Sequence, residues 1–188
     1  MICGSNGAGQ RLNTFALVAY IPDPLAQFVD GLRRELVPAC PARAHITILP
    51  PRPLSADPAL AASRVRALLG DFPPFEVEAT NVRIFPITDV VHIEVGRGAQ
   101  ELHLLHEALN EGLLAFEEPF DYHPHITLAQ DLPSDQVETV FERARRVWAA
   151  SKPPSRFVLD AATFVQNSLV DIWIDLEEFR LKSVAPVR

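Results

Sequence analysis

The tripeptide His-Ile-Thr occurs twice in this chain, at residues 45–47 and again at residues 125–127. Each copy lies in a strand-like segment, 44–49 or 124–130, that follows another strand and a helix: 13–21 and 24–37 before the first copy, 90–96 and 99–115 before the second. A helix and two strands then follow each copy: 58–70, 75–85 and 90–96 after the first, 134–149, 156–166 and 169–176 after the second. Because segment 90–96 belongs to both comparisons, the sequence predicts a duplicated unit whose halves interlock.

Two of the predicted helices begin with the same dipeptide, at Asp23-Pro24 and Asp57-Pro58. An aspartate can accept hydrogen bonds from the free N–H groups of a first helical turn, and a proline at the first helical position loses no hydrogen bond. We therefore expect both aspartates to act as helix caps.

The strands alternate between apolar and polar residues. Segment 90–96 places His92 and Glu94 opposite its apolar residues, and segment 169–176 does the same with Asp171 and Asp175. One-sided alternation is typical of antiparallel sheets that have one wet face. We therefore expect an α+β fold: a duplicated two-lobed unit in which antiparallel sheets face a central groove and helices pack outside.

The bulk properties of the chain limit its domain organisation and its partners. Residues 13–188 are expected to form a single two-lobed domain after a flexible tail at 1–12, since no Gly- or Ser-rich linker separates the halves. Only two cysteines, Cys3 and Cys40, are present, which favours a cytoplasmic setting, and no apolar run is long enough for a membrane span. A net charge of -7 argues against a long nucleic-acid duplex as partner, although a single phosphate needs only a local pocket.

Residues two apart in a strand point to the same side, so each motif aims a histidine and a threonine in one direction. His45 is paired in this way with Thr47, and His125 with Thr127. If a pseudo-twofold axis relates the lobes, two imidazoles and two hydroxyls surround one small volume. One imidazole can accept a proton while the other donates one near neutral pH, and the hydroxyls can donate to phosphoryl oxygens, which suits phosphoester cleavage.

This pair of motifs resembles the His-x-Thr/Ser signature of the two-histidine phosphoesterase superfamily, specifically its RNA 2',3'-cyclic phosphodiesterase or 2'-5' RNA ligase-like branch. The resemblance implies hydrolysis of 2',3'-cyclic phosphate ends of RNA or small nucleotides, with no metal or cofactor and with ligation as a weak reverse reaction. It implies His45 and His125 as the catalytic acid–base pair and Thr47 and Thr127 as phosphate binders. His125 is favoured as the base and His45 as the acid, although the opposite assignment stays open. No membrane and no obligate protein partner is implied, and a monomer is expected.

Residues near the motifs are candidates for contact with the substrate. These are Arg43, Tyr122 and His123, together with Arg52 and with Phe120 and Phe85 as further aromatic surfaces. Gln130 stands where several family members have a basic residue, and the proline-rich LPPRPL follows the first motif where the branch has a glycine-ended turn. Both departures border the expected groove and leave the natural substrate open.

Two other functions compete with this one. A module that binds RNA ends or nucleotides without turnover would keep the same groove. A histidine-triad nucleotide hydrolase would explain HPHITL, but that family requires a third alternating histidine where this chain has Thr127. The pair His123 and His125 could also hold a metal, but no nearby carboxylate or cysteine completes a familiar ligand set.

Overall fold

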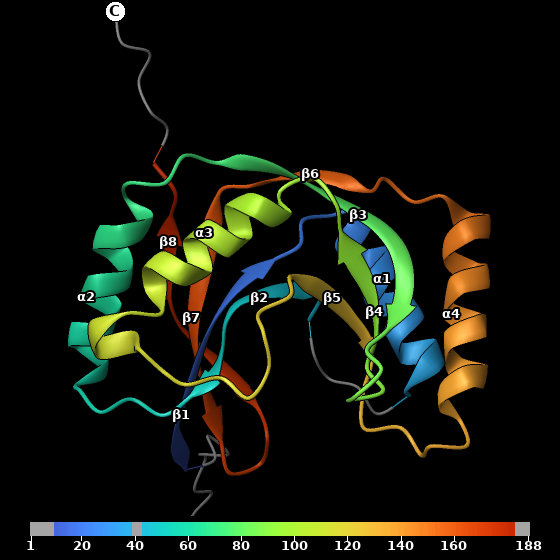
Figure 1. Cartoon of the computed structure of the whole chain (residues 1–188), viewed down its shortest axis with the longest axis horizontal. Helices are drawn as coiled ribbons and strands as arrows, with labels where there is room; N and C mark the ends of the chain where they lie inside the picture. The colour runs from blue at the N-terminus through green and yellow to red at the C-terminus, as the bar shows by residue number, and fades with distance from the viewer. Residues whose placement is uncertain (1–9, 39–42, 183–188) are drawn as a thin grey trace, which may run out of the picture.

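The computed structural model describes residues 10–38 and 43–182, and within them the strands form one sheet. The eight strands are antiparallel and lie in the order β6-β3-β4-β5-β2-β1-β7-β8 (Figure 1). Their bounds are β1 Arg11–Tyr20, β2 His45–Arg52, β3 Phe75–Ile84, β4 Val91–Val95, β5 His125–Ala129, β6 Arg156–Leu159, β7 Ala161–Ser168 and β8 Trp173–Arg180. The expected α+β class with antiparallel pairing is confirmed.

The two motif strands are neighbours at the centre of this sheet. Strand β2 pairs with β1 on one side and strand β5 pairs with β4 on the other, so β1, β7 and β8 extend one lobe and β4, β3 and β6 the other. The two lobes are thus halves of one continuous sheet that meet at β2 and β5. The predicted duplication is seen in the order of the elements, because β1-α1-β2 and β4-α3-β5 occupy matching places on either side of the β2–β5 pair.

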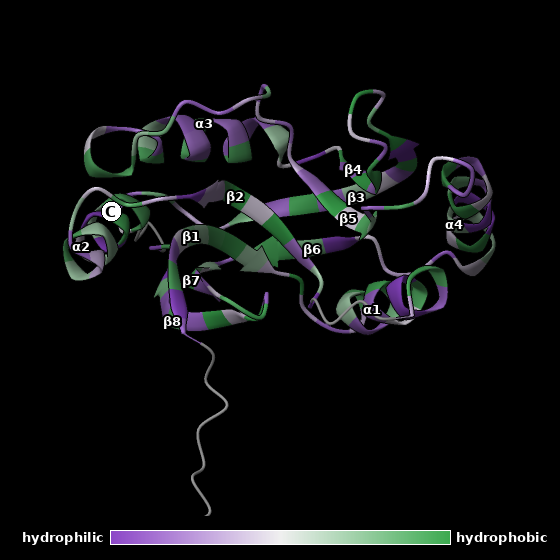
Figure 2. Ribbon diagram, turned by 90° about the horizontal axis from the view of Figure 1, so that it is seen from below, coloured by the Kyte–Doolittle hydropathy of each residue, from purple (hydrophilic) through white to green (hydrophobic). Residues whose placement is uncertain are grey.

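The helices cross from one lobe to the other. Helix α1 (Leu25–Leu36) leaves β1 and packs on β5, whereas α3 (Ala99–Leu109) leaves β4 and packs on β2. Helix α2 (Pro58–Leu69) accompanies α3, and α4 (Val137–Ser151) accompanies α1, with the short 3-10 turn η1 at Gly112–Leu114. The two helix pairs therefore lie on opposite sides of the molecule, as Figures 1 and 2 show. This exchange interlocks the halves.

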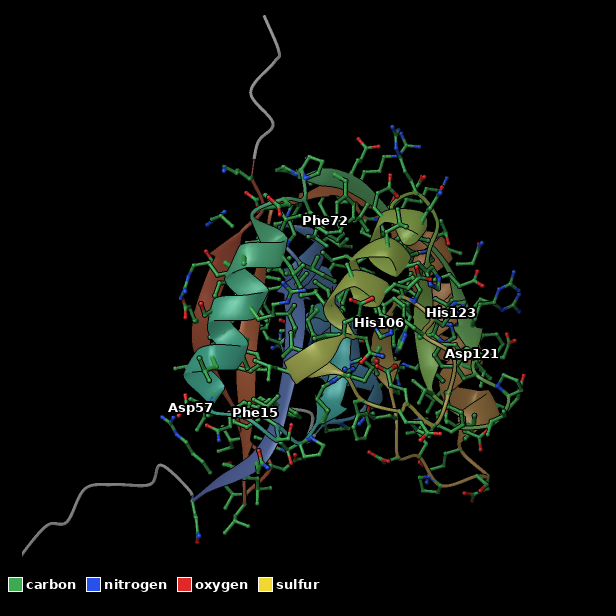
Figure 3. All side chains as sticks on the ribbon, turned by 60° about the vertical axis from the view of Figure 1, so that its left-hand side comes forward. Phe15, Asp57, Phe72, His106, Asp121 and His123 are labelled. Carbon is green, nitrogen blue, oxygen red and sulfur yellow. The ribbon has the colours of Figure 1, made fainter. Side chains whose placement is uncertain are left out.

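The core lies between these helices and one face of the sheet. Ile46, Ile48, Ile126 and Leu128 of the motif strands are fully buried there, together with the apolar stripes of the helices. Figure 3 shows the side chains that fill this layer beneath α2 and α3. Burial of these residues on one side of β2 and β5 fixes which residues point to the other side.

One of the two predicted helix caps is correct. Asp57 precedes α2 and accepts a hydrogen bond from the backbone N–H of Ala59 at 2.7 Å. Asp23 is not a cap, because α1 is preceded by Pro24 with helical backbone angles and makes no side-chain cap bond. The Asp23 carboxylate instead accepts a hydrogen bond from the Gln27 side chain at 2.9 Å.

The predicted strands at the C-terminal end differ from those observed. Segment 156–166 contains two strands with different partners, since β6 pairs with β3 and β7 pairs with β1. Residues 169–172 form the turn before β8, so Val170 and Ile172 are more than half exposed and do not contribute to an apolar strand face. The first nine residues of the predicted tail and both cysteines, Cys3 and Cys40, lie outside the described residues. No helix in the described part of the chain is long and apolar enough to cross a membrane.

Candidate active site

The pairing of β2 with β5 brings the two motifs onto one face of the sheet. Ile46 is the cross-strand partner of Ile126, and both isoleucines are buried in the core. In an antiparallel pair, this register sets His45 opposite Thr127 and Thr47 opposite His125, all four on the side away from the core. We call this side the motif face. The two histidines are diagonal neighbours there, at a separation of roughly 7–8 Å between cross-strand diagonal positions.

Both motif histidines make the same hydrogen bond to their own strand. His45 Nδ1 lies 2.6 Å from the carbonyl oxygen of Arg43, and His125 Nδ1 lies 2.7 Å from that of His123. A carbonyl only accepts hydrogen bonds, so each Nδ1 is the protonated nitrogen. Nε2 of each neutral ring therefore carries the lone pair that can take part in proton transfer.

Burial lowers the pKa of both motif histidines below the usual value of 6.5. The cause is loss of water around the charged form, which the hydrogen bonds to the backbone carbonyls oppose. Positive charge on Arg33 and on the other motif histidine lowers the pKa of His45 further. At neutral pH the two rings are therefore predominantly uncharged in the free protein.

Aromatic rings enclose His125 on its side of the face. Phe85 lies edge-on to His125 at 4.9 Å between ring centroids and stacks on His92 at 3.8 Å. His92 is the cross-strand partner of Thr127 and is 2% exposed, so its predicted solvated position is wrong. Burial lowers the pKa of His92 to about 4, which keeps this third imidazole neutral. His123 is exposed and lies edge-on to Phe85 at 5.2 Å.

A polar cluster borders His45 on the other side. Tyr20 is the cross-strand partner of His45, with its ring edge-on at 6.4 Å. The guanidinium of Arg43 lies 3.3 Å above the Tyr20 ring and 3.6 Å from a carboxylate oxygen of Asp175. The Tyr20 hydroxyl donates a hydrogen bond to the same carboxylate. The predicted candidate Arg43 therefore borders the site, together with Tyr20, which the sequence analysis did not single out.

Tyr122 contacts the back of the first motif strand instead of lying free on the motif face. Its ring stacks on that of His106 at 4.0 Å, and its hydroxyl donates to the carbonyl oxygen of Thr47 at 3.0 Å. His106, labelled in Figure 3, in turn has its Nδ1 2.8 Å from the carbonyl oxygen of Ile48. These contacts give Tyr122 a positioning role for β2.

Tyr122→Phe should separate positioning from stacking on a substrate. The phenylalanine keeps the ring but leaves the Thr47 carbonyl without its donor, so we expect the free energy of unfolding to fall by about 1 kcal/mol. Urea denaturation measures this change. If Tyr122 acted only as a stacking surface for a base, stability would be unchanged.

Arg52, a candidate for contact with the substrate, is instead part of a buried polar network. It is 2% exposed and donates hydrogen bonds to the side chain of Asn110, to the carbonyl of Leu114 and to the carboxylate of Glu118. The guanidinium therefore attaches the segment after α3 to the end of β2. The predicted aromatic candidate Phe120, in the same segment, is 52% exposed.

Within residues 10–38 and 43–182, no group of three or more His, Cys, Asp or Glu side chains is arranged to hold a metal ion. Gln130, at the end of the second motif, is exposed and donates a hydrogen bond to Asp131 at 3.2 Å.

This chain thus has a curled antiparallel sheet with two His-x-Thr strands paired at its centre, and it matches the 2'-5' RNA ligase superfamily, also known as two-histidine phosphoesterases. The model of this superfamily matches residues 21–171, and the chain belongs to it. A Geobacillus kaustophilus protein named "Putative phosphoesterase" is 25% identical over 140 residues, which cover 70% of this chain and 77% of that protein. One of the same name from Oceanobacillus iheyensis is 31% identical over 80 residues, covering 42% of this chain and 46% of that protein.

Solved structures share the fold at low sequence identity. E. coli LigT, in a crystal with 3'-AMP, has a TM-score of 0.60 and 18% identity, with 92% of this chain and 98% of LigT covered. A Thermus thermophilus protein has a TM-score of 0.63 and 16% identity, with 90% of this chain and 98% of that protein covered. These similarities support the overall fold.

Proposed function

We propose that this protein is a metal-independent phosphodiesterase that opens 2',3'-cyclic phosphates at the ends of RNA or on small nucleotides. The observation that carries the proposal is the register of β2 and β5, which sets two imidazoles and two hydroxyls on one face. Membership of the superfamily and relatives named as phosphoesterases support the same reaction class. Proton transfer and hydroxyl donation are the chemistry that such a set provides.

In the proposed reaction, Nε2 of His125 accepts a proton from a water molecule whose oxygen attacks the phosphorus atom. The bond from phosphorus to one ribose oxygen breaks, and His45, protonated at Nε2, donates its proton to that oxygen. Thr47 and Thr127 donate hydrogen bonds to the non-bridging oxygens, where negative charge increases. The products are a ribose hydroxyl and a phosphate monoester, and proton exchange with solvent restores both histidines.

We assign His125 as the base because of its surroundings. The Phe85 ring and the neutral His92 ring border it, at 4.9 Å and 5.4 Å between centroids, and neither stabilises a positive charge as a carboxylate would. By contrast, negative charge on Asp30 raises the pKa of His45, although burial outweighs it. Positive charge on Arg33 and His125 also lowers the pKa of His45, so the assignment rests on the carboxylate alone: one acts on His45, and none of the groups that shift the pKa of His125 is a carboxylate.

The proposal is tested by incubating the purified, EDTA-treated protein with a short RNA that ends in a 2',3'-cyclic phosphate, and with cyclic mononucleotides. We expect a phosphate monoester product, identified by chromatography and mass spectrometry. Turnover that depends on added metal would contradict the mechanism. Binding without cleavage would instead identify a non-catalytic module that binds RNA ends or nucleotides.

The pH dependence follows from the lowered pKa values of the two histidines. The base acts when it is neutral, above its pKa, and the acid acts when it is protonated, below its pKa. Because both values lie below 6.5, kcat/KM should be highest on the acid side of pH 6.5 and should fall as pH rises through neutrality. A bound anionic phosphate stabilises imidazolium, so the optimum of kcat should lie at higher pH than that of kcat/KM. Initial rates from pH 4.5 to 8.5 measure both profiles, and an optimum of kcat/KM above pH 7 would contradict the assignment.

A further inference from the structure

The motif face continues beyond the four motif residues, across β1, β7 and β8. Val18 is the cross-strand partner of Thr47, Thr163 is the partner of Val18, and Glu178 is the partner of Thr163. Partners in an antiparallel sheet share a face, so Glu178 lies on the same side of the sheet as the motif residues. One row of side chains thus joins the candidate active site to the edge strand β8.

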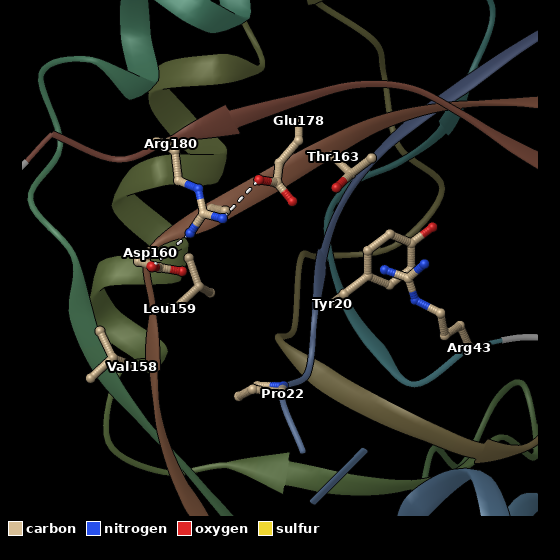
Figure 4. A pocket seen from close by; sticks show the side chains of 10 residues that line it. Tyr20, Pro22, Arg43, Val158, Leu159, Asp160, Thr163, Glu178 and Arg180 are labelled. Carbon is tan, nitrogen blue, oxygen red and sulfur yellow. Dashed lines mark hydrogen bonds and ion pairs between the residues drawn. The ribbon is translucent and has the colours of Figure 1, made fainter. Parts of the chain in front are cut away.

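A pocket of about 130 Å³ lies along this row (Figure 4). Six polar or aromatic side chains in its lining determine its chemistry: Tyr20, Arg43, Asp160, Thr163, Glu178 and Arg180. Tyr20 also lies edge-on to His45, and Arg43 is two residues before His45, in the segment that leads into β2. The pocket therefore begins where the candidate active site ends.

The charges in this pocket are already paired. Arg180 lies 2.9 Å from a carboxylate oxygen of Asp160 and 3.0 Å from Oε1 of Glu178. Arg43 lies 3.6 Å from Asp175 and covers the Tyr20 ring. A second phosphate would meet these carboxylates, so the pocket suits an uncharged group that both donates and accepts hydrogen bonds. The Tyr20 ring and the buried Val18 add apolar surface beside it.

The position of the pocket relates it to the same substrate. Neighbouring strands lie about 4.8 Å apart, so along the row Thr163 on β7 is roughly 10 Å, and Glu178 on β8 roughly 14 Å, from Thr47 on β2. A ribose and its base that extend from a cyclic phosphate, together with the side chain of Glu178, span a comparable distance. A flat, uncharged base with polar edges meets all the requirements above.

We propose that this pocket binds the base of the nucleotide that carries the cyclic phosphate, and that Glu178 selects bases with an amino group. A carboxylate only accepts hydrogen bonds, so it matches the amino group of cytosine and not the carbonyl oxygen that uracil has in its place. Because Arg180 is paired with Oε1, we expect Oε2 of Glu178 to be the acceptor. This inference rests on the proposed function, since the phosphate must lie at the motif histidines.

The test compares 2',3'-cyclic CMP with 2',3'-cyclic UMP, whose bases differ in the group at ring position 4 and in the hydrogen on the adjacent N3. We expect kcat/KM to favour the cytidine substrate about tenfold. This lies toward the low end of the discrimination that a contact to one base provides, because Glu178 is half exposed and water competes for its carboxylate. In Glu178→Gln the amide can also donate a hydrogen bond, so the preference should shrink to about twofold or reverse. Equal rates for both substrates in the wild-type protein, or a preference that Glu178→Gln leaves intact, would overturn the proposal.

Glu177→Gln is the matched control. Glu177 is the next residue on β8, pairs with Phe164 on the core side and contacts Arg66, outside the pocket. Glu177→Gln should retain the full preference for cytidine. Loss of this preference in Glu177→Gln as well as in Glu178→Gln would also overturn the selective role of Glu178.

Failure of the proposed reaction can be separated from failure of the pocket. If neither cyclic nucleotide is hydrolysed, titration calorimetry with 2'-CMP and 2'-UMP tests the pocket on its own. Tighter binding of the cytidine nucleotide that Glu178→Gln abolishes would support the pocket while the hydrolase proposal fails. Equal affinities for both nucleotides would overturn it.

Discussion

Replacing His125 by alanine should lower kcat for 2',3'-cyclic nucleotides by roughly 10²–10⁴-fold, and replacing His45 should have an effect of the same order. Each change removes the only proton-transfer group that one motif places on the face. Because the proposed mechanism uses both rings in one reaction, the double variant should be no more than about tenfold slower than the worse single variant. Rates with saturating substrate give kcat directly.

His103→Ala is the control for this experiment. His103 lies on α3, edge-on to Tyr122 at 5.3 Å, and does not belong to the motif face. Its kcat should stay within about threefold of the wild-type value. Unfolding midpoints of all variants show whether a lost activity reflects lost folding, and full activity in folded His45→Ala would exclude the acid–base pair.

Arg52→Leu should cause the largest loss of stability, about 3–5 kcal/mol in the free energy of unfolding. The guanidinium is 2% exposed, and its removal leaves the buried Glu118 carboxylate without its ion-pair partner. The carbonyl of Leu114 loses the Arg52 donor as well, and the side-chain oxygen of Asn110 is left with the backbone N–H of Phe116. Urea denaturation at neutral pH measures this effect.

Arg66→Leu provides a matched comparison on the surface. Arg66 also pairs with a glutamate, Glu177, but the two side chains are 57% and 37% exposed. Its removal should cost less than about 1 kcal/mol, since water screens an exposed pair. The double variant Arg52→Leu with Glu118→Leu should recover part of the loss, because no buried charge then stays unpaired. Equal losses in Arg52→Leu and Arg66→Leu would show that the buried network adds little.

The sequence predicted the fold class and the pairing of motif residues because both depend on local periodicity. Alternation within the motif strands sets which residues share a face, and buried Ile46 and Ile126 show that this face turns away from the core. The adjacency of β2 and β5 was not predicted, since the order of strands in a sheet depends on long-range pairing that alternation within a strand does not encode.

His92 shows why the surroundings of the site were missed. Its alternation with Val91 and Ile93 correctly indicated the face opposite the core, but that face is covered at this point by Phe85 from the end of β3. The buried structural role of Arg52 was missed for a related reason, because its partners are 58 to 66 residues away in the sequence. Likewise, the strand break at Asp160 follows from pairing with two different strands, β3 and β1, and not from a local breaker residue.

The register of Ile46 against Ile126 has a consequence for how this activity could arise. Each half of the chain supplies one proton-transfer group and one hydroxyl, and each hydroxyl lies opposite the histidine of the other half. A shift of one residue between the two strands would turn the histidines toward the core and the isoleucines toward solvent. Under the proposed mechanism, neither half alone therefore forms a partial catalyst. The complete set of groups comes together where β2 pairs with β5, so each half depends on the other for the proposed activity.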